Sequence, residues 1–292
     1  MIEKRLVQWY AADSGVDLDI AEREIVLTYV MKVLCDAGLL PHLAFKGGTA
    51  IRKIFLGNQG RFSLDLDFTM VSDFSPEVFV LDVVSILHDQ EHFGITFDIR
   101  SEDYYANPDS CGAIVTYQHS WSTNGKFSFQ VSFRAKPILP VQPASFIKER
   151  YFQWLGIEPP LVPTLDLHEI IGEKIRASAQ RSRIRDLYDL YQFASMKFDR
   201  NIVRRIAILK CWETNYSFNP VAFFQTLPEK QYDWADLERL VRHSKALTPL
   251  VVFEKIQQSY RFLVEMNEDE GILANDPYRR ERKVYQRLLS SF

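Results

Sequence analysis

The chain has 292 residues, of which 47% are hydrophobic, 13% aromatic and 25% charged, and this composition excludes disorder as the main state. Lys and Arg number 35 against 38 Asp and Glu, so the formal net charge of -3 excludes a surface that is basic throughout, while a local basic patch for RNA stays open. The sequence has no signal peptide, no paired cysteine motif and no apolar run near the roughly 18 residues of a membrane span, which predicts a cytoplasmic protein that does not enter a membrane.

The first half of the sequence predicts helices alternating with strands. Helices are indicated by apolar residues at helical spacing, and the helix at Ser75–Pro76 has an N-cap followed by proline at its first position. Strands are indicated by short apolar runs or by strict alternation of polar and apolar residues. We expect a mixed sheet of about five strands flanked by helices. The predicted helices cover residues 17–40, 50–55 and 75–92, and the predicted strands cover residues 43–45, 62–70, 95–99, 113–117 and 127–133.

The second half has a different character. Prolines 159, 160 and 163 interrupt the chain, and from Leu165 onward the sequence is helical in pattern. Asp166 with Glu169 fits a capping box at the start of this region. The fold class is therefore α/β, with a mixed sheet flanked by helices in residues 1–158 and an all-helical domain in residues 159–292.

Two acidic residues form the sharpest local feature. Asp65 and Asp67 alternate with apolar residues on the strand predicted at 62–70, so both side chains should point to one face. Two neighbouring carboxylates can bind a hard divalent cation such as Mg²⁺. Such ions can hold both the attacking and the leaving oxygen of a phosphoryl transfer. Taken alone, the pair also fits a solvated strand face.

A glycine turn precedes this strand. Lys46, Gly47, Gly48 and Thr49 connect a short strand to a helix. Glycines let the backbone approach a phosphate closely, and a helix N-terminus offers unpaired N–H groups. Together, the turn and the two acids suit one task, which is to hold a nucleoside triphosphate and its metal.

The helical half contains a third group. Lys174, Arg181, Arg183 and Arg185 form a local cluster of cations that could offset phosphate charge. A solvated helix with internal pairs between arginines and aspartates explains the same residues more simply. The density of cations in a chain that is net acidic favours the functional explanation.

These blocks together resemble a known family. Phe45–Ile51, Arg61–Phe68, Glu173–Lys174 and Arg185–Leu190 agree in order and spacing with the AbiEii/AbiGii-type nucleotidyltransferase toxins. That family is a branch of the DNA polymerase β-like nucleotidyltransferase superfamily, and the chain is also similar to the MenT toxins of mycobacteria. The resemblance covers about residues 40–195.

The resemblance implies a metal-dependent enzyme that transfers a nucleoside monophosphate from an NTP to an acceptor hydroxyl. It implies Mg²⁺ or Mn²⁺ as the cofactor, the 3′ end of tRNA as the acceptor and a cognate antitoxin protein as a partner. It also implies that the toxin belongs to a toxin–antitoxin or abortive-infection system. Residues 1–158 would be the nucleotidyltransferase domain, and the helical domain at 159–292 would complete the active-site cleft.

The resemblance also assigns roles residue by residue. Asp65 and Asp67 stand at the metal-binding acids, and Lys174 stands at a lysine expected to contact the triphosphate. Asp189, or else Asp186, stands at the late aspartate of the family. The expected catalytic residues are Asp65, Asp67, Lys174 and Asp189, and the expected nucleotide-binding residues are Lys46, Gly47, Gly48, Thr49, Ser63, Arg181 and Arg185.

One departure from the superfamily concerns a third carboxylate on a later strand. On the strand predicted at 127–133 the outward residues are Ser128, Gln130 and Ser132, and none is acidic. Asp98 or Asp189 could replace the missing acid. A second hypothesis is therefore a catalytically weak nucleotide-binding or partner-binding module of the same fold.

A third hypothesis rests on the sequence His88-Asp-Gln-Glu-His92, which matches the H-x-x-E-H pattern of zinc proteases. On a helix, His88 and His92 could bind zinc with Glu91 as general base. Their place at the end of the predicted helix favours a polar helix end instead.

Overall fold

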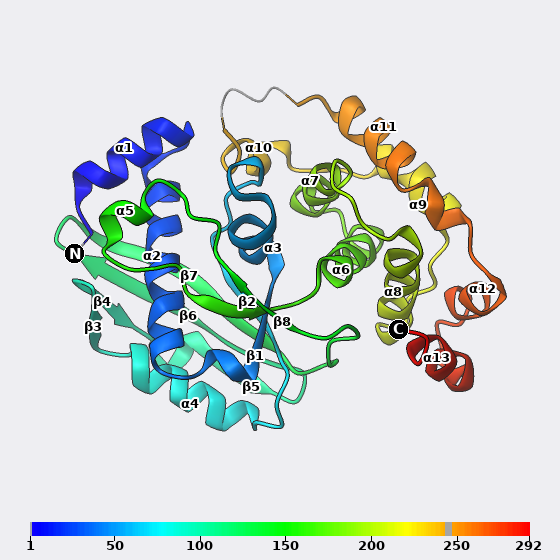
Figure 1. The fold of residues 1–292 in the computed structure, drawn as a ribbon, viewed down its shortest axis with the longest axis horizontal. Helices are drawn as coiled ribbons and strands as arrows, with labels where there is room; N and C mark the ends of the chain where they lie inside the picture. The colour runs from blue at the N-terminus through cyan, green and yellow to red at the C-terminus, as the bar shows by residue number, and fades with distance from the viewer. Residues whose placement is uncertain (1, 243–246) are drawn as a thin grey trace. The chain divides into compact units, whose positions relative to one another are not determined.

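The computed structural model of the chain describes residues 2–242 and 247–292. It divides into two compact units. The first consists of Met1–Pro137, Val141–Leu165 and Arg239–Ser244, and the second consists of Ile138–Pro140, Asp166–Glu238 and Lys245–Phe292. The first unit is mixed α/β and the second is mostly helical, so the predicted fold class is confirmed (Figure 1). Among the described residues, none of the helices is long and apolar enough to cross a membrane.

The first unit is built on a nine-stranded mixed sheet with the order β3-β4-β6-β7-β2-β1-β9-β8, in which β5 also pairs with β6. The pairs β2–β7 and β1–β9 are parallel and the others are antiparallel. The strands are β1 (Leu43–Lys46), β2 (Leu66–Met70), β3 (Gln90–His92), β4 (Ile95–Asp98), β5 (Tyr104–Asn107), β6 (Ser110–His119), β7 (Ser122–Ser132), β8 (Gln142–Ser145) and β9 (Leu161–Thr164).

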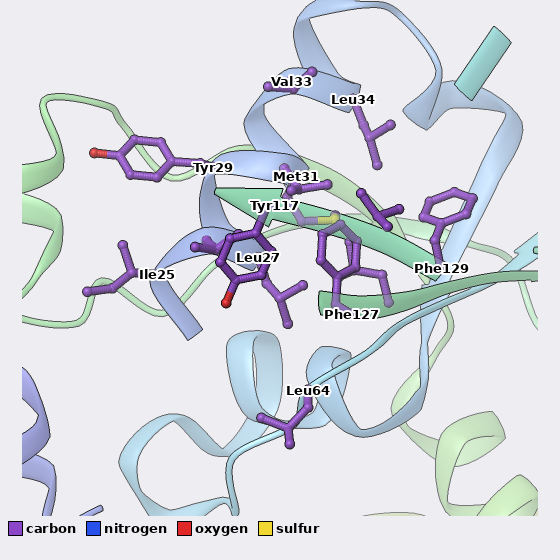
Figure 2. Close-up of a cluster of buried hydrophobic side chains, with 14 of the residues drawn as sticks. Ile25, Leu27, Tyr29, Met31, Val33, Leu34, Leu64, Tyr117, Phe127 and Phe129 are labelled. Carbon is purple, nitrogen blue, oxygen red and sulfur yellow. The ribbon is translucent and has the colours of Figure 1, made fainter. Parts of the chain in front are cut away.

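Helices cover one face of this sheet (Figure 1). Apolar residues surround nearly the whole circumference of α2, which is the pattern of an enclosed helix. Figure 2 shows its side chains Leu27, Met31 and Leu34 beside Phe127 and Phe129 of the sheet. The helices of this unit are α1 (Lys4–Ser14), α2 (Leu18–Asp36), α3 (Gly47–Ala50), the π-helical η2 (Ile51–Leu56), α4 (Pro76–Leu87) and α5 (Phe152–Leu155), with short 3-10 turns η1 (Leu40–His42), η3 (Gly57–Gln59) and η4 (Ser101–Asp103).

The register of the strands separates the two faces of the sheet. Phe68 of β2, Val131 of β7 and Cys111 of β6 are neighbours, and all three are buried on the face that the helices cover. The next residues along these strands point to the opposite face, because side chains alternate along a strand. Asp67 therefore lies on the face away from the core.

In the second unit, α6 packs against α7 and α8. Gly172 allows α6 and α8 to approach closely, because a β-carbon at this position would lie 2.5 Å from Ile206 Cγ2. The helices are α6 (Leu167–Gln180), α7 (Ile184–Phe193), α8 (Arg200–Glu213), α9 (Pro220–Thr226), α10 (Trp234–Glu238), α11 (Pro249–Ser259), α12 (Glu268–Ala274) and α13 (Arg282–Leu289), with 3-10 turns η5 (Leu227–Glu229) and η6 (Arg261–Val264).

Several boundaries differ from the sequence predictions. The strand predicted from residue 62 begins only at Leu66, and the helix predicted to reach residue 92 ends at Leu87. Asp166 does cap α6, accepting the N–H of His168 at 2.8 Å. The Glu169 carboxylate, however, accepts N–H groups from Ile138 and Leu139 at 3.0 Å, so the expected capping box is wrong in its second half.

Candidate active site

The acid on β2 has a neighbour on each side. Asp67 lies opposite Lys46 of the antiparallel strand β1 and opposite Gln130 of the parallel strand β7. Its side chain is half-buried. The residue beside Asp67 on β7 is therefore the amide that the sequence suggested, and not a third carboxylate.

Asp65 lies just before β2 and is anchored from two directions. Its Oδ1 accepts the backbone N–H of Ser128 at 3.2 Å, which ties the carboxylate to β7. The Thr49 hydroxyl donates a short hydrogen bond to the Asp65 carbonyl, which ties the same residue to α3. The side chain is half-buried. Only Asp67 belongs to β2, but these two hydrogen bonds also hold the backbone and side chain of Asp65 in place.

The glycine turn packs directly against Asp67. Gly47 has a φ of +75°, and a β-carbon at this position would lie 2.3 Å from Asp67 Oδ2 and 2.8 Å from Asp67 Cβ. Both the backbone conformation and the available space therefore require glycine. The turn and the acid pair, separated by about twenty residues in the sequence, form one local structure.

The second glycine contacts two polar side chains. A β-carbon at Gly48 would lie 2.6 Å from Arg61 Nη2 and 2.7 Å from Ser63 Oγ. Both residues are buried, with Arg61 only 4% exposed, and its Nη1 donates to the Phe62 carbonyl at 3.1 Å. Arg61 was not among the predicted site residues. The sequence feature that could have identified Arg61 is its spacing, since Arg61, Ser63, Asp65 and Asp67 occupy every second position.

Replacing Gly47 with Ala should disturb both stability and the placement of Asp67. The positive φ costs about 1–2 kcal/mol for a residue with a β-carbon, and the contact with Asp67 adds a clash that must move the carboxylate. Gly38→Ala is the matched control, because Gly38 has a φ of +72° but nothing within 4 Å of the new β-carbon. We expect both variants to lower the midpoint of thermal unfolding, and Gly47→Ala alone to lose most of the transfer activity that the family resemblance implies. Equal activity of the two variants would contradict a role for this contact.

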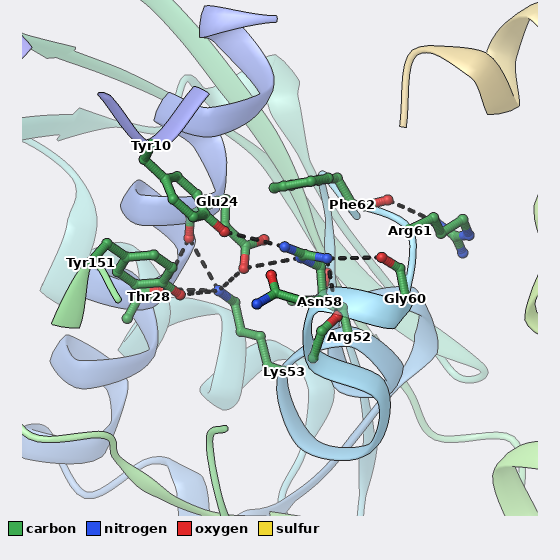
Figure 3. A network of polar contacts seen from close by, with 12 residues as sticks. Tyr10, Glu24, Thr28, Arg52, Lys53, Asn58, Gly60, Arg61, Phe62 and Tyr151 are labelled. Carbon is green, nitrogen blue, oxygen red and sulfur yellow. Dashed lines mark hydrogen bonds and ion pairs between the residues drawn. The ribbon is translucent and has the colours of Figure 1, made fainter. Parts of the chain in front are cut away.

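A buried ionic network holds the segment between the glycine turn and the acids (Figure 3). Arg52 lies in the π-helix η2 and donates from Nη1 to the carbonyls of Gly57 and Gly60 at 3.1 and 2.8 Å. Its guanidinium lies 3.7 Å from the centroid of the Phe62 ring. Glu24 of α2 pairs with Arg52 at 3.4 Å and with Lys53 at 3.0 Å. This network fixes the chain that leads to Arg61 and Ser63.

The second unit contains its own cluster of charges. Lys174 of α6 lies between two aspartates of α7, with Nζ 2.9 Å from Asp186 Oδ1 and 2.7 Å from Asp189 Oδ2. Both aspartates are almost fully buried. Arg181 Nε donates to Asp186 Oδ2 at 2.7 Å. Burial raises the pKa of Asp186, but Lys174 and Arg181 outweigh this effect and hold that pKa well below its usual range.

Arg185 is oriented by a residue that the sequence did not single out. Its Nε donates to Asp236 Oδ2 at 2.6 Å, and a second hydrogen bond joins Nη2 to Oδ1. Asp236 lies on α10, 51 residues further along the chain. The predicted site residues therefore form a first group of Lys46, Gly47, Gly48, Thr49, Ser63, Asp65 and Asp67, and a second group of Lys174, Arg181 and Asp189, while Arg185 is held by Asp236.

The zinc protease hypothesis is wrong because its helix is missing. The chain leaves α4 at Leu87, and Glu91 and His92 lie on β3. His88 Nδ1 is 2.8 Å from Asp98 Oδ1, whereas His92 Nε2 is 2.8 Å from the Ile86 carbonyl. Each histidine thus has its own structural partner.

Asp98 does not replace the missing third acid. It lies on β4, which is separated from β2 by β6 and β7. In the part of the chain that the structure describes, the group of three or more potential metal ligands within reach of one another is His88, Asp89 and Asp98, and it excludes Glu91 and His92.

Comparisons with known proteins identify a family and a similar fold. Residues 29–267 match the family model described as the nucleotidyl transferase AbiEii toxin of type IV toxin–antitoxin systems. Among solved structures, the chain is similar to the nucleotidyltransferase toxin MenT4 of Mycobacterium tuberculosis H37Rv, with a TM-score of 0.84 and 25% identity over 100% of this chain and 99% of that one. No curated protein matched the sequence.

Proposed function

Because the chain belongs to the AbiEii family of nucleotidyltransferase toxins of type IV toxin–antitoxin systems, we propose that it transfers a nucleoside monophosphate from an NTP to the 3′-terminal hydroxyl of a tRNA. The observation that carries this proposal is the contact between Gly47 of the glycine turn and the carboxylate of Asp67. This contact supports the proposal, because a backbone that could bind phosphate adjoins an acid that could bind a metal ion. A cognate antitoxin is the proposed protein partner.

The donor set of the first unit fits a hard divalent cation. Asp65 uses one carboxylate oxygen for the N–H of Ser128, and Asp67 extends over the glycine turn. Mg²⁺ or Mn²⁺ commonly binds one or two carboxylates and completes its coordination with waters and substrate phosphates. When bound, such an ion supplies charge stabilisation to the phosphates of the transferring group.

The residues of the chain have separate tasks in the proposed reaction. The acceptor hydroxyl oxygen attacks the α-phosphorus and forms the new bond, and its proton is released to solvent. The bond from that phosphorus to the bridging oxygen breaks, and pyrophosphate leaves. The backbone at Gly47 and Gly48 orients the phosphates, with Lys46, Thr49 and Ser63 beside it.

The cations of the second unit are proposed to bind phosphate. Lys174 offsets the charge of the triphosphate. Arg181 and Arg185, which follow within eleven residues of Lys174, are proposed to offset phosphate charge as well. Asp189 is a positioning residue, because its carboxylate holds Lys174 Nζ at 2.7 Å. Asp186 holds the same ammonium from the other side at 2.9 Å.

A transfer assay tests the proposal. Purified protein is incubated with Mg²⁺, each labelled NTP in turn and total tRNA, and an Asp65→Ala/Asp67→Ala variant is the control. We expect label from one or more NTPs to move to tRNA with the wild-type protein, and none with the variant. Label on protein instead of RNA would keep the chemistry and overturn the tRNA acceptor.

A catalytically weak binding module is the second candidate, and Gln130 favours it. This amide stands beside Asp67 on β7 and cannot take a proton from the attacking hydroxyl. In that case each NTP would bind without transfer to RNA or protein, and Asp67→Asn would leave any biological effect of the protein unchanged.

A further inference from the structure

A row of residues leads from Asp67 across the open face of the sheet. The strand registers align Asp67 of β2 with Gln130 of β7, Gly112 of β6 and Tyr105 of β5. Residues aligned in this way point to the same face, here the face opposite the helices. Gln130 and Tyr105 are both exposed, so this part of the face is accessible to a ligand.

The ring of Tyr105 lies close to a glycine. A β-carbon at Gly112 would lie 2.7 Å from the Phe129 carbonyl oxygen, 2.9 Å from Tyr105 Cε1 and 3.1 Å from Tyr105 Cζ, so the ring packs into space that glycine leaves beside the backbone. Gln130 Nε2 donates to the Tyr105 hydroxyl at 3.4 Å and holds the ring toward the row that contains Asp67. Tyr105 as a whole is 40% exposed.

The position of this ring fits an acceptor that approaches Asp67. Gly112 lies two strands away from Asp67, which corresponds to about 10 Å at the usual strand spacing. This separation corresponds to between one and two nucleotides of an extended single strand. A base stacked on Tyr105 would thus leave the next sugar within reach of the carboxylates.

The surroundings favour a nucleobase over an apolar peptide. On the same face, β7 presents Ser128 and the exposed Lys126 at alternate positions from Gln130. A planar base has an apolar face for the ring and polar edges for these side chains, and Lys126 can bind a backbone phosphate. Ile114 is aligned with Ser128 and is 43% exposed on this face, but with Ser128 and Lys126 it does not form the large apolar patch that a protein partner would need.

We propose that Tyr105 is a stacking platform for a base near the reacting end of a single-stranded RNA acceptor, with Gln130 as the residue that positions its ring. The inference rests on the proposed function, because it names the chemistry by which the acceptor is recognised. Any base can stack on the ring, so the platform supplies affinity and placement without reading the sequence.

The neighbouring residue Tyr104 provides a matched control. It is 43% exposed, close to the 40% of Tyr105, and lies on the same strand. Its register partner is Ala113, whose side chain is buried on the face that the helices cover, so Tyr104 points to the opposite face. The two tyrosines therefore differ mainly in the face of the sheet that they occupy.

The test measures binding of a fluorescently labelled single-stranded oligoribonucleotide of mixed sequence by anisotropy. We expect Tyr105→Ala to raise the Kd about 5- to 150-fold, and Tyr105→Phe to keep most of the affinity because the ring remains. We expect Tyr104→Ala to change the Kd less than about twofold, and we expect all variants to retain the wild-type unfolding midpoint and NTP affinity. An absence of binding by the wild type, or equal losses at Tyr104 and Tyr105, would overturn the proposal.

A second readout separates this inference from the proposed function. In the tRNA transfer assay, Tyr105→Ala should raise the KM for tRNA with little change in kcat. If the wild type transfers no label but RNA binding still depends on Tyr105, the proposed reaction fails and the platform stands. If transfer proceeds and its dependence on tRNA concentration is the same in Tyr105→Ala, the platform fails and the reaction stands.

Discussion

Replacing Asp67 with Asn should lower the rate of nucleotide transfer by about 10³-fold or more, while the protein remains folded. The amide is nearly isosteric with the carboxylate, so the packing against Gly47 is kept. What is lost is an anionic oxygen ligand for a hard divalent cation. A 10³-fold loss corresponds to about 4 kcal/mol of transition-state stabilisation, which is within the range of one metal-ion contribution.

The control for this experiment is another Asp→Asn change that leaves the site alone. Asp73 is exposed and pairs with Lys136 at 3.2 Å on the surface of the first unit. Asp73→Asn should keep the wild-type transfer rate within about twofold, because an exposed ion pair contributes little. A single-turnover assay with excess enzyme measures the chemical step directly. A rate for Asp67→Asn within tenfold of the wild type would remove this carboxylate from the proposed mechanism.

The central part of the first unit could be predicted from the sequence because its signals are local. A strand, a glycine turn and a helix follow one another within a few residues, and the structure has them as β1, α3 and η2. The glycine predicted to form the turn, Gly47, adopts a positive φ, which glycine tolerates without strain. Ser75 likewise caps α4 by accepting the N–H of Val78 at 3.2 Å.

Other features depended on contacts that no short segment contains. The strands β8 and β9 include Pro143 and Pro163, which argue against a strand. However, β8 is the edge strand of the sheet, where a missing N–H is tolerated, and β9 pairs with β1 at Thr164, one residue beyond Pro163. The chain leaves the helical path after Leu87, and Asp89 and Phe93 then adopt positive φ values of 54° and 57°. Because the chain turns here, His92 lies on β3, and His88 and His92 do not share the helix that the zinc motif requires.

The ion-pair partners of the charged site residues also could not be predicted from local sequence patterns. The cations of the second unit could be counted from the sequence, but their partners could not be assigned. Arg185 pairs with Asp236 across 51 residues, which no local pattern indicates. In the first unit, Glu24 lies in the middle of the enclosed helix α2, where the apolar pattern alone gives no reason for a carboxylate. The carboxylate of Glu24 is explained by its ion pairs with Arg52 and Lys53.

The largest effect on stability should follow from Glu24→Gln. Glu24, Arg52 and Lys53 are each almost fully buried, and the carboxylate is the anion shared by both cations. Removing it leaves buried positive charge, which costs about 3–5 kcal/mol when one partner of a buried pair is deleted. Chemical denaturation at pH 7 should measure this loss as a lower free energy of unfolding.

A surface pair provides the control for burial. Lys148 and Glu158 are joined at 3.0 Å, the same distance as Lys53 and Glu24, but their side chains are 60% and 84% exposed. Glu158→Gln should therefore change the free energy of unfolding by less than about 1 kcal/mol. Similar losses in the two variants would contradict the view that burial makes the Glu24 network costly to break.

The pH dependence of the Glu24→Gln variant tests the cause of its instability. In the wild type, burial lowers the pKa of Lys53 and the charge of Glu24 opposes this effect, with a lowered pKa as the net result. Without Glu24 the pKa of Lys53 should fall further, so the folded state loses its proton at a pH where the unfolded state still holds it. The unfolded state then binds more protons, and the stability of the variant must rise as the pH increases toward the normal pKa of lysine. The stability gap between variant and wild type should accordingly narrow between neutral and alkaline pH, and a gap that stays constant would show that lost packing, and not unpaired charge, causes the loss.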